Sequence, residues 1–159
     1  MRRYAAFVVV AGALALVAVG CGGSSGTTLH VVADNAAVKT IDLGANGKSP
    51  GDVYAFDGPV RDQDGMLQLG HVYGTQTEIS LTSDSEIVQS LITYHFLGDD
   101  SITIGGIAAY PRGNIGLIPG KSFERSILGG TGKYAYARGT VTTRRRSDGR
   151  YDQIFHLNG

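Results

Sequence analysis

From about residue 29 onward, short runs rich in Val, Ile, Tyr, Thr and Phe alternate with clusters of Gly, Asp, Asn and Pro. No stretch of this region repeats its apolar positions with the 3.6-residue period of a helix. Runs of this kind, bounded by turn residues, are typical of β-strands. The pattern therefore predicts an all-β domain with strands near Leu29–Val38, Asp52–Phe56, Leu67–Leu81, Glu86–Leu97, Ser101–Ala109, Ser122–Leu128, Ala137–Arg145 and Tyr151–Leu157.

The segments between these strands carry turn residues, such as Asp62-Gln63-Asp64-Gly65 and Ser147-Asp148-Gly149, so neighbouring strands are expected to be antiparallel. Antiparallel strands in one small sheet leave two unpaired edges unless the sheet closes into a barrel. Several of the 24 glycines fall inside predicted strands, where glycine marks bulges and tight bends at barrel corners. We therefore predict an eight-stranded antiparallel β-barrel, with an open sandwich as the alternative.

The N-terminal segment has a different pattern. Two arginines precede an unbroken apolar run from Tyr4 to Val19, and small residues then lead to Cys21, the only cysteine. A charged start, an apolar run and a small-residue step are typical of an export signal, and this run is short for a membrane-spanning helix. We expect residues 1–20 to be a signal peptide that is removed, with a retained signal anchor as the alternative.

The end of this segment resembles the lipobox of bacterial lipoproteins, in which the cysteine after the cleavage step receives diacylglycerol, so Cys21 is predicted to be lipidated. Residues 21–28 are rich in Gly and Ser, a composition typical of a flexible tether. Residues 29–159 have the size of one domain. We therefore expect a single barrel domain on the extracytoplasmic face of the cell membrane, which it reaches through the lipid anchor.

Charge and cysteine content exclude some functions and sources of stability. Without the two signal arginines, 12 of the 14 Lys and Arg residues remain against 14 Asp and Glu, so the domain is slightly acidic. This balance argues against nucleic acid as a partner. Lipidation would occupy the only cysteine, so no disulfide is expected and the domain depends on packing and hydrogen bonds.

The most distinctive segment of the domain is Gly129–Gly139, with the sequence GGTGKYAYARG. A phosphate-binding loop would need glycine at position 127 and Ser or Thr at position 134, where Ile127 and Tyr134 stand. A dinucleotide fingerprint is also excluded, because no helical pattern follows the glycines. The residues instead predict a strand that ends in a glycine-rich corner, where positive φ costs little, followed by a compact turn.

This segment resembles the signature shared by plant dirigent proteins and the allene oxide cyclase barrel superfamily. Residues Gly51–Val60 look like the dirigent pattern GD, three residues, FD, one residue, P and an aliphatic residue, and Leu69–Gly74 resembles the strand with two glycines that follows it. The likeness runs from about Leu29 to Gly159. It implies an eight-stranded barrel with an apolar cavity at one end. Family members form dimers or trimers, so the oligomeric state is left open between a monomer and a homo-oligomer.

Dirigent proteins steer the coupling of phenoxy radicals, and allene oxide cyclases close an unstable epoxide into a cyclopentenone. Both reactions depend on holding a reactive intermediate in one shape. The resemblance therefore implies a small apolar or aromatic ligand, isomerisation or cyclisation as the reaction class, and no cofactor. Because a shared fold does not transfer a reaction, a lipocalin-like carrier or a cell-envelope interaction protein without catalysis is the second hypothesis.

Two charged residues match dirigent positions. Asp34 stands where dirigent proteins place a functional aspartate on the first strand, and Arg138 fits the arginine of their ARG step. Lys133 departs from the pattern, because pinoresinol-forming dirigents have an acid there, and the pocket cysteine of allene oxide cyclases is absent. We predict catalytic roles for Asp34 and Arg138. If the side chains of Asp34 and Arg138 both point into one pocket, an enzyme is favoured. If they point outward, with Arg138 bonded to loop carbonyls, a binding protein is favoured.

Aromatic residues provide the predicted ligand-binding surface. Tyr54, Tyr73 and Tyr110 combine an apolar ring with a polar tip, which suits aromatic ligands, although core packing explains them equally well. His95 is the histidine expected to line the pocket. The four histidines lie on different predicted strands without the spacing of metal ligands, so we predict no metal site.

Overall fold

The computed structural model describes residues 26–113 and 116–158. The predicted signal peptide and Cys21 lie outside these ranges. No helix in the described ranges has the length and apolar character needed to cross a membrane. The elements are β1 (Thr27–Ala33), β2 (Ala37–Ile41), β3 (Val53–Arg61), β4 (Gln68–Leu81), β5 (Ser85–Phe96), β6 (Ser101–Pro111), β7 (Ser122–Thr131), the 3-10 turn η1 (Gly132–Tyr134), β8 (Gly139–Arg145) and β9 (Tyr151–Leu157).

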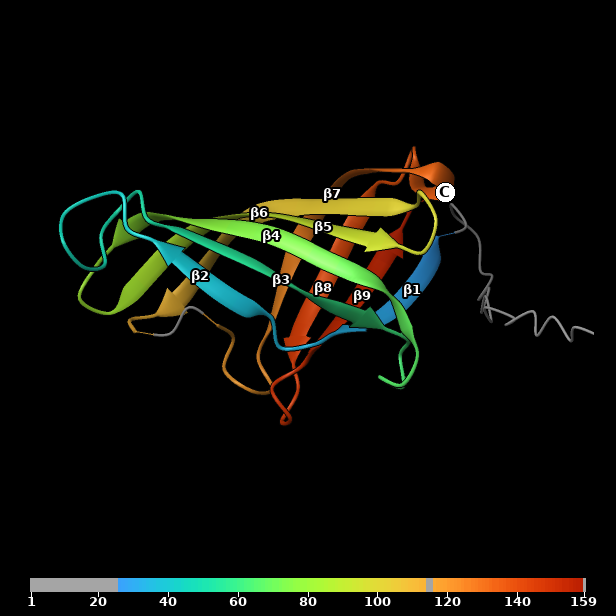
Figure 1. The fold of residues 1–159 in the computed structure, drawn as a ribbon, viewed down its shortest axis with the longest axis horizontal. Coiled ribbons are helices and arrows are strands. Elements are labelled where there is room, and N and C mark those ends of the chain that lie inside the picture. The colour runs from blue at the N-terminus through green and yellow to red at the C-terminus, as the bar shows by residue number, and fades with distance from the viewer. Residues whose placement is uncertain (1–25, 114–115, 159) are drawn as a thin grey trace, which may run out of the picture.

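The strands form one antiparallel sheet that closes on itself (Figure 1). Each strand from β3 to β9 pairs with its neighbour in sequence, and β1 pairs with β9 along its whole length and with β3 at its end. β2 continues beside β3 as an extra strand. The prediction of an all-β, eight-stranded antiparallel barrel is confirmed, with β1 and β3 to β9 as its strands, and the sheet is not an open sandwich.

The first predicted strand, Leu29–Val38, is wrong in one respect, because it is broken at residues 34–36. Ala33 pairs with Val60 and Ala37 pairs with Asp57, so three residues of the break lie opposite two residues of β3. The extra residue has no pairing partner in the ladder. Beyond this break, β2 pairs with β3 and is not one of the strands that close the barrel. Gly58 permits the close approach, since a Cβ there would lie 3.3 Å from the Cα of Ala36.

The barrel interior has an apolar half and a polar half. The apolar half contains fully buried side chains from six strands, and the ring of Tyr94 meets that of Phe155 edge-on with centroids 5.1 Å apart. In the other half, the inward positions of β4, β5, β7, β8 and β9 carry polar groups, namely Gln76, Glu78, Glu86, Ser90, Arg125, Thr143 and Gln153. Because alternate residues of a strand face the interior, these residues share the inner wall with the apolar core.

The glycine-rich segment forms the corner between β7 and β8, as predicted, although β7 extends three residues beyond the expected end at Leu128. Gly132 and Gly139 have positive φ angles of 58° and 128°. A Cβ on Gly139 would overlap the carbonyl oxygen of His156, and one on Gly130 would overlap that of Ser101. The glycines of this segment are therefore required by the backbone geometry of the barrel corner.

Candidate functional site

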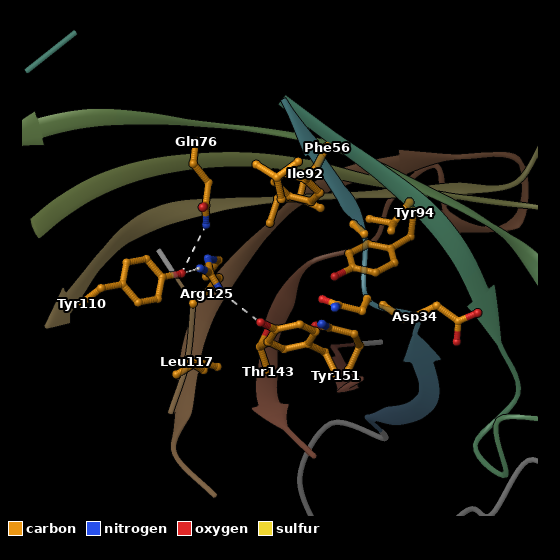
Figure 2. Close-up of a pocket in the computed structure, with 17 residues that line it drawn as sticks. Asp34, Phe56, Gln76, Ile92, Tyr94, Tyr110, Leu117, Arg125, Thr143 and Tyr151 are labelled. Atoms are coloured by element: carbon orange, nitrogen blue, oxygen red, sulfur yellow. Dashed lines mark hydrogen bonds between the residues drawn. The ribbon is translucent and has the colours of Figure 1, made fainter. Parts of the chain in front are cut away.

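A cavity of about 120 Å³ lies between the apolar and polar halves of the barrel, beside the break between β1 and β2 (Figure 2). Its wall is formed by inward side chains of β3 to β9, by residues 33–36 at the break, by Val38 of β2, and by Gly116 and Leu117. An engineered apolar cavity of roughly 150 Å³ accepts one benzene molecule, so the space here matches a single aromatic ring. Larger parts of a ligand would extend through the opening.

Arg125 is the central polar residue of this cavity. It is only 5% exposed, and its two Nη atoms donate to the hydroxyl of Tyr110 at 3.1 Å and to Oγ1 of Thr143 at 3.5 Å. Its Nε has no hydrogen-bond partner. Within the described residues, no carboxylate lies within ion-pair distance of the guanidinium. The cavity therefore contains a buried positive charge without a counter-ion.

The neighbours of Arg125 are joined in one hydrogen-bond network (Figure 2). Gln76 donates from Nε2 to the hydroxyl of Tyr110 at 3.2 Å and to Ser90 at 3.3 Å. Thr143 donates to Oε1 of Gln153 at 2.8 Å. Six strands, β4 to β9, thus fix the guanidinium and its partners in one orientation, and such preorganised donors are what a site needs to hold a polar group of a ligand.

The opposite wall is aromatic and aliphatic. Phe56, Val72, Ile92 and Tyr94 line it, and Figure 2 shows the ring of Tyr94 across the cavity from Arg125. Burial raises the pKa of the Tyr94 hydroxyl above its ordinary value, while the positive charge of Arg125 acts in the opposite direction. The Tyr94 hydroxyl therefore remains protonated near neutral pH and acts as a neutral hydrogen-bonding group.

Asp34 lies at the cavity edge, in the break after β1. Its Oδ2 accepts a hydrogen bond from Nε of Arg61 at 2.7 Å, and the two side chains form an ion pair. Figure 2 shows its carboxylate turned away from Arg125. The carboxylate is thus held by an arginine, but this arginine is Arg61 of β3 and not Arg138.

Arg138 is placed away from the cavity. Its side chain is exposed, and its Nη1 donates to the carbonyl oxygen of Ala137 at 2.8 Å. The reason is its position directly before Gly139, where the chain turns into β8 and the side chain folds back on its own turn. The structure therefore does not bring Asp34 and Arg138 together, and the outward placement of Arg138 is the one that favours a binder.

The four predicted ligand-binding residues have different locations. Tyr110 lines the cavity. Tyr73 and His95 are exposed at the outer face of β4 and β5, and Tyr73 lies in a shallow outer groove. Their orientation follows from strand alternation, because their inward neighbours are Val72 and Tyr94. The sequence predicted the strands but not which face entered the barrel.

Tyr54 is buried inside the barrel but belongs to a second polar cluster beyond the cavity. Its hydroxyl lies 3.5 Å from Oε2 of Glu78, and Lys48 pairs with Glu86. Burial and the nearby Glu78 raise the pKa of Tyr54 to about 12. Burial, with Glu86 close by, also raises the pKa of Glu78, whose Oε1 has no hydrogen-bond partner.

Sequence reasoning missed the central residue of the cavity, Arg125. A usable signal existed, since Phe123 and Ile127 flank it at period two within a predicted strand and place all three side chains on one face. Gln76 and Thr143 lack this signal, because their neighbours at period two include Glu78 and Arg145. Within the described ranges, no three His, Cys, Asp or Glu side chains gather as a metal site requires.

Comparison with known proteins shows which family the sequence matches. The family model described as dirigent-like protein matches residues 20–158, which is most of the chain. No curated protein matches the chain in sequence.

Solved structures share the fold at low sequence identity. A pyocyanin demethylase is 22% identical with a TM-score of 0.64, covering 80% of this chain and 99% of that one. A pterocarpan synthase dirigent protein is 23% identical with a TM-score of 0.57, covering 85% and 97%. A nonspecific heme-binding cyclase of neoabyssomicin biosynthesis is 15% identical with a TM-score of 0.63, covering 86% and 69%. At these identities the likeness concerns the fold alone.

Proposed function

The chain belongs to the dirigent-like protein family, and from this premise we propose that its barrel binds a small apolar or aromatic molecule and guides its isomerisation or cyclisation. The observation that carries the proposal is the cavity, which combines an aromatic and aliphatic wall with one fixed polar group. The pterocarpan synthase and the cyclase with the same fold support cyclisation as the reaction class.

Catalysis in such a site would come from positioning. A flexible precursor enclosed against Tyr94, Ile92 and Phe56 loses most of its conformers, and the remaining conformer brings the reacting atoms together. The hydroxyl groups of Tyr94 and Tyr110 and the guanidinium of Arg125 then stabilise charge that develops on an oxygen of the ligand. No strong nucleophile is needed for this type of reaction.

A carrier without catalysis is the second candidate. It is favoured by the placement of the two predicted catalytic residues, since Arg138 lies outside the cavity and the Asp34 carboxylate is occupied by Arg61. Without these two residues, the cavity wall provides hydrogen bonds and a positive charge but no carboxylate free to act as a base.

For location, we propose export and lipid anchoring through Cys21, supported by the charged and apolar pattern of residues 1–20 and the Gly/Ser-rich tether. The test is the distribution of the full chain in a bacterial host. The chain is expected in the membrane fraction, and Cys21→Ala is expected to release it or leave it unprocessed. A processed Cys21→Ala chain that stays in the membrane fraction as fully as the unchanged protein would contradict the lipid anchor.

The ligand role is tested by filling the cavity. Small molecules released on denaturing the purified full chain would be identified by mass spectrometry and compared with those from Ala36→Phe, which places a ring at the cavity edge. We expect at least tenfold less bound molecule in this variant. Ala109→Phe places the same ring on the exposed face of β6 and serves as the control. Equal amounts in all three proteins would contradict a ligand in the cavity.

An enzyme and a carrier are distinguished by whether the bound small molecule is converted into a product. Isomerisation and cyclisation conserve mass, so incubating a small-molecule extract of the source culture with the protein is expected to convert one chromatographic peak into another of equal mass. A carrier depletes the free peak without forming a new one. The Ala36→Phe variant should do neither.

A further inference from the structure

We propose that the ligand of the barrel carries an oxyanion, as a carboxylate or as a phenolate or enolate oxygen conjugated to a ring, and that Arg125 and Tyr110 bind it. This inference rests on the proposed ligand-binding function and names the class of ligand. It starts from a feature that the fold does not require, namely a buried arginine on the inner wall of the barrel that has no ion-pair partner among the described residues.

Arg125 is a costly residue in the empty protein. A guanidinium removed from water loses its hydration, and an ion pair normally offsets part of this loss. Among the residues that the structure describes, the guanidinium has two neutral hydroxyl groups as its hydrogen-bond partners, and the Nε has none. The guanidinium carbon lies over the ring of Phe123, 5.5 Å from the ring centroid, and this contact adds a weak attraction. An anion from outside the protein would supply the missing counter-charge.

The protein's own carboxylates are kept away from Arg125. Asp34 is the acidic residue among those that line the cavity, and its carboxylate is paired with Arg61 at 2.7 Å. Glu78 and Glu86 belong to the second cluster with Tyr54 and Lys48. The positive charge of the cavity is therefore left for a ligand, and a neutral apolar molecule would not use it.

Tyr110 supplies a second donor beside the guanidinium. Its hydroxyl oxygen accepts hydrogen bonds from Gln76 at 3.2 Å and from Arg125 at 3.1 Å, which occupies both of its lone pairs. Its own proton must then point elsewhere, and within the described residues it meets no acceptor. Because Tyr110 lines the cavity, this proton is available to a ligand oxygen adjacent to the guanidinium.

The size of the cavity limits the rest of the ligand. A volume of about 120 Å³ encloses one ring, and Tyr94, Ile92 and Phe56 form the apolar wall opposite Arg125. The two features together select a molecule with one aromatic ring or a short apolar chain that ends in an oxyanion. Such a ligand satisfies the guanidinium and buries its apolar part in the same binding event.

The test uses two probes of nearly the same shape, trans-cinnamate and its neutral amide, trans-cinnamamide. Dissociation constants at pH 7.5 would be measured by NMR titration with the purified full chain. We expect cinnamate to bind at least tenfold more tightly than cinnamamide. Arg125→Met should reduce this preference to less than twofold by weakening cinnamate alone, and Arg125→Lys should restore part of it. Tyr110→Phe should weaken cinnamate without changing the fold.

Arg144→Met is the matched control, because Arg144 is exposed on β8 and its loss changes the net charge by the same amount. Its preference for cinnamate should equal that of the unchanged protein. If both probes bind equally tightly and Ala36→Phe abolishes both, the cavity binds ligands but the oxyanion proposal is wrong. If cinnamate binding responds equally to Arg125→Met and Arg144→Met, the preference arises from overall charge, and the proposal is also wrong. If neither probe binds at millimolar concentration, the cavity is not a ligand site and both proposals fail.

Discussion

Replacing the buried Arg125 by methionine is expected to stabilise the folded protein. The change relieves a desolvation cost of several kcal/mol. It also removes the hydrogen bond to Tyr110 at 3.1 Å, worth about 1.5–3 kcal/mol because the donor is charged, whereas the 3.5 Å contact with Thr143 contributes little. Tyr110 keeps its bond from Gln76, and Thr143 keeps its bond to Gln153, so no buried group loses its last partner.

Methionine is flexible and fills the space left by the arginine stem. Taking these contributions together, we expect the free energy of unfolding to rise by about 1–3 kcal/mol, which lies within the roughly 1–4 kcal/mol that replacing a buried ion pair by apolar residues can add. Urea unfolding, followed by far-ultraviolet circular dichroism, should show the midpoint moving upward by roughly 1 M at unchanged slope.

The exposed control Arg144→Met should stay within about 0.5 kcal/mol of the unchanged protein. A fall of 1 kcal/mol or more in Arg125→Met, with Arg144→Met neutral, would refute the reasoning, because it would mean that Arg125 stabilises the empty barrel. A rise in stability together with a loss of cinnamate preference would show that this side chain serves binding at the expense of folding.

Two further predictions concern other parts of the barrel. Burial and Glu86 raise the pKa of Glu78 above its ordinary 4.5, so the folded state holds this proton more tightly than the unfolded state and stability falls as the pH rises above 4.5. Glu78→Gln should therefore flatten urea-unfolding stability across this range and increase it at pH 7; an unchanged pH profile would contradict the raised pKa. Gly139→Ala should lower the unfolding free energy by about 2 kcal/mol or more, because its φ is 128° and a Cβ would overlap the His156 carbonyl. Gly149→Ala has a positive φ in open space and should cost less; equal losses in the two variants would show that the overlap with β9 is unimportant.

The fold was largely predictable because its main determinant is local. Period-two alternation and turn residues locate strands, and these signals placed β4, β5 and β9 within about two residues of their observed bounds. The break at residues 34–36 was not predictable in the same way. It depends on three residues lying opposite two of β3, and on the contact of Ala36 with Gly58, which is distant in sequence.

The candidate site was less predictable, because alternation identifies two faces without saying which one is inside. His95 and Tyr94 are adjacent in sequence, yet one is exposed and the other lies in the cavity wall. The apolar neighbours at period two resolve this ambiguity for Arg125, but they do not reveal whether a distant acid meets it. Only the closed barrel shows that Asp34 pairs with Arg61 and leaves Arg125 without a counter-ion.

The residues that identify the family and the residues that line the cavity are different sets. Gly130, Gly132 and Gly139 of the signature allow backbone approaches and φ angles that the corner between β7 and β8 requires, and Arg138 of the same segment faces outward. A family match based on such positions therefore establishes the barrel but says little about its ligand. We expect the ligand to be selected by inward positions such as 76, 110 and 125, where a side chain can change without affecting strand pairing. The most informative comparison among barrels of this family is therefore the charge of the residue at the position of Arg125. A neutral residue there would leave no buried positive charge for an anionic ligand to pair with, and this charge is the feature that we expect to define the ligand of this protein.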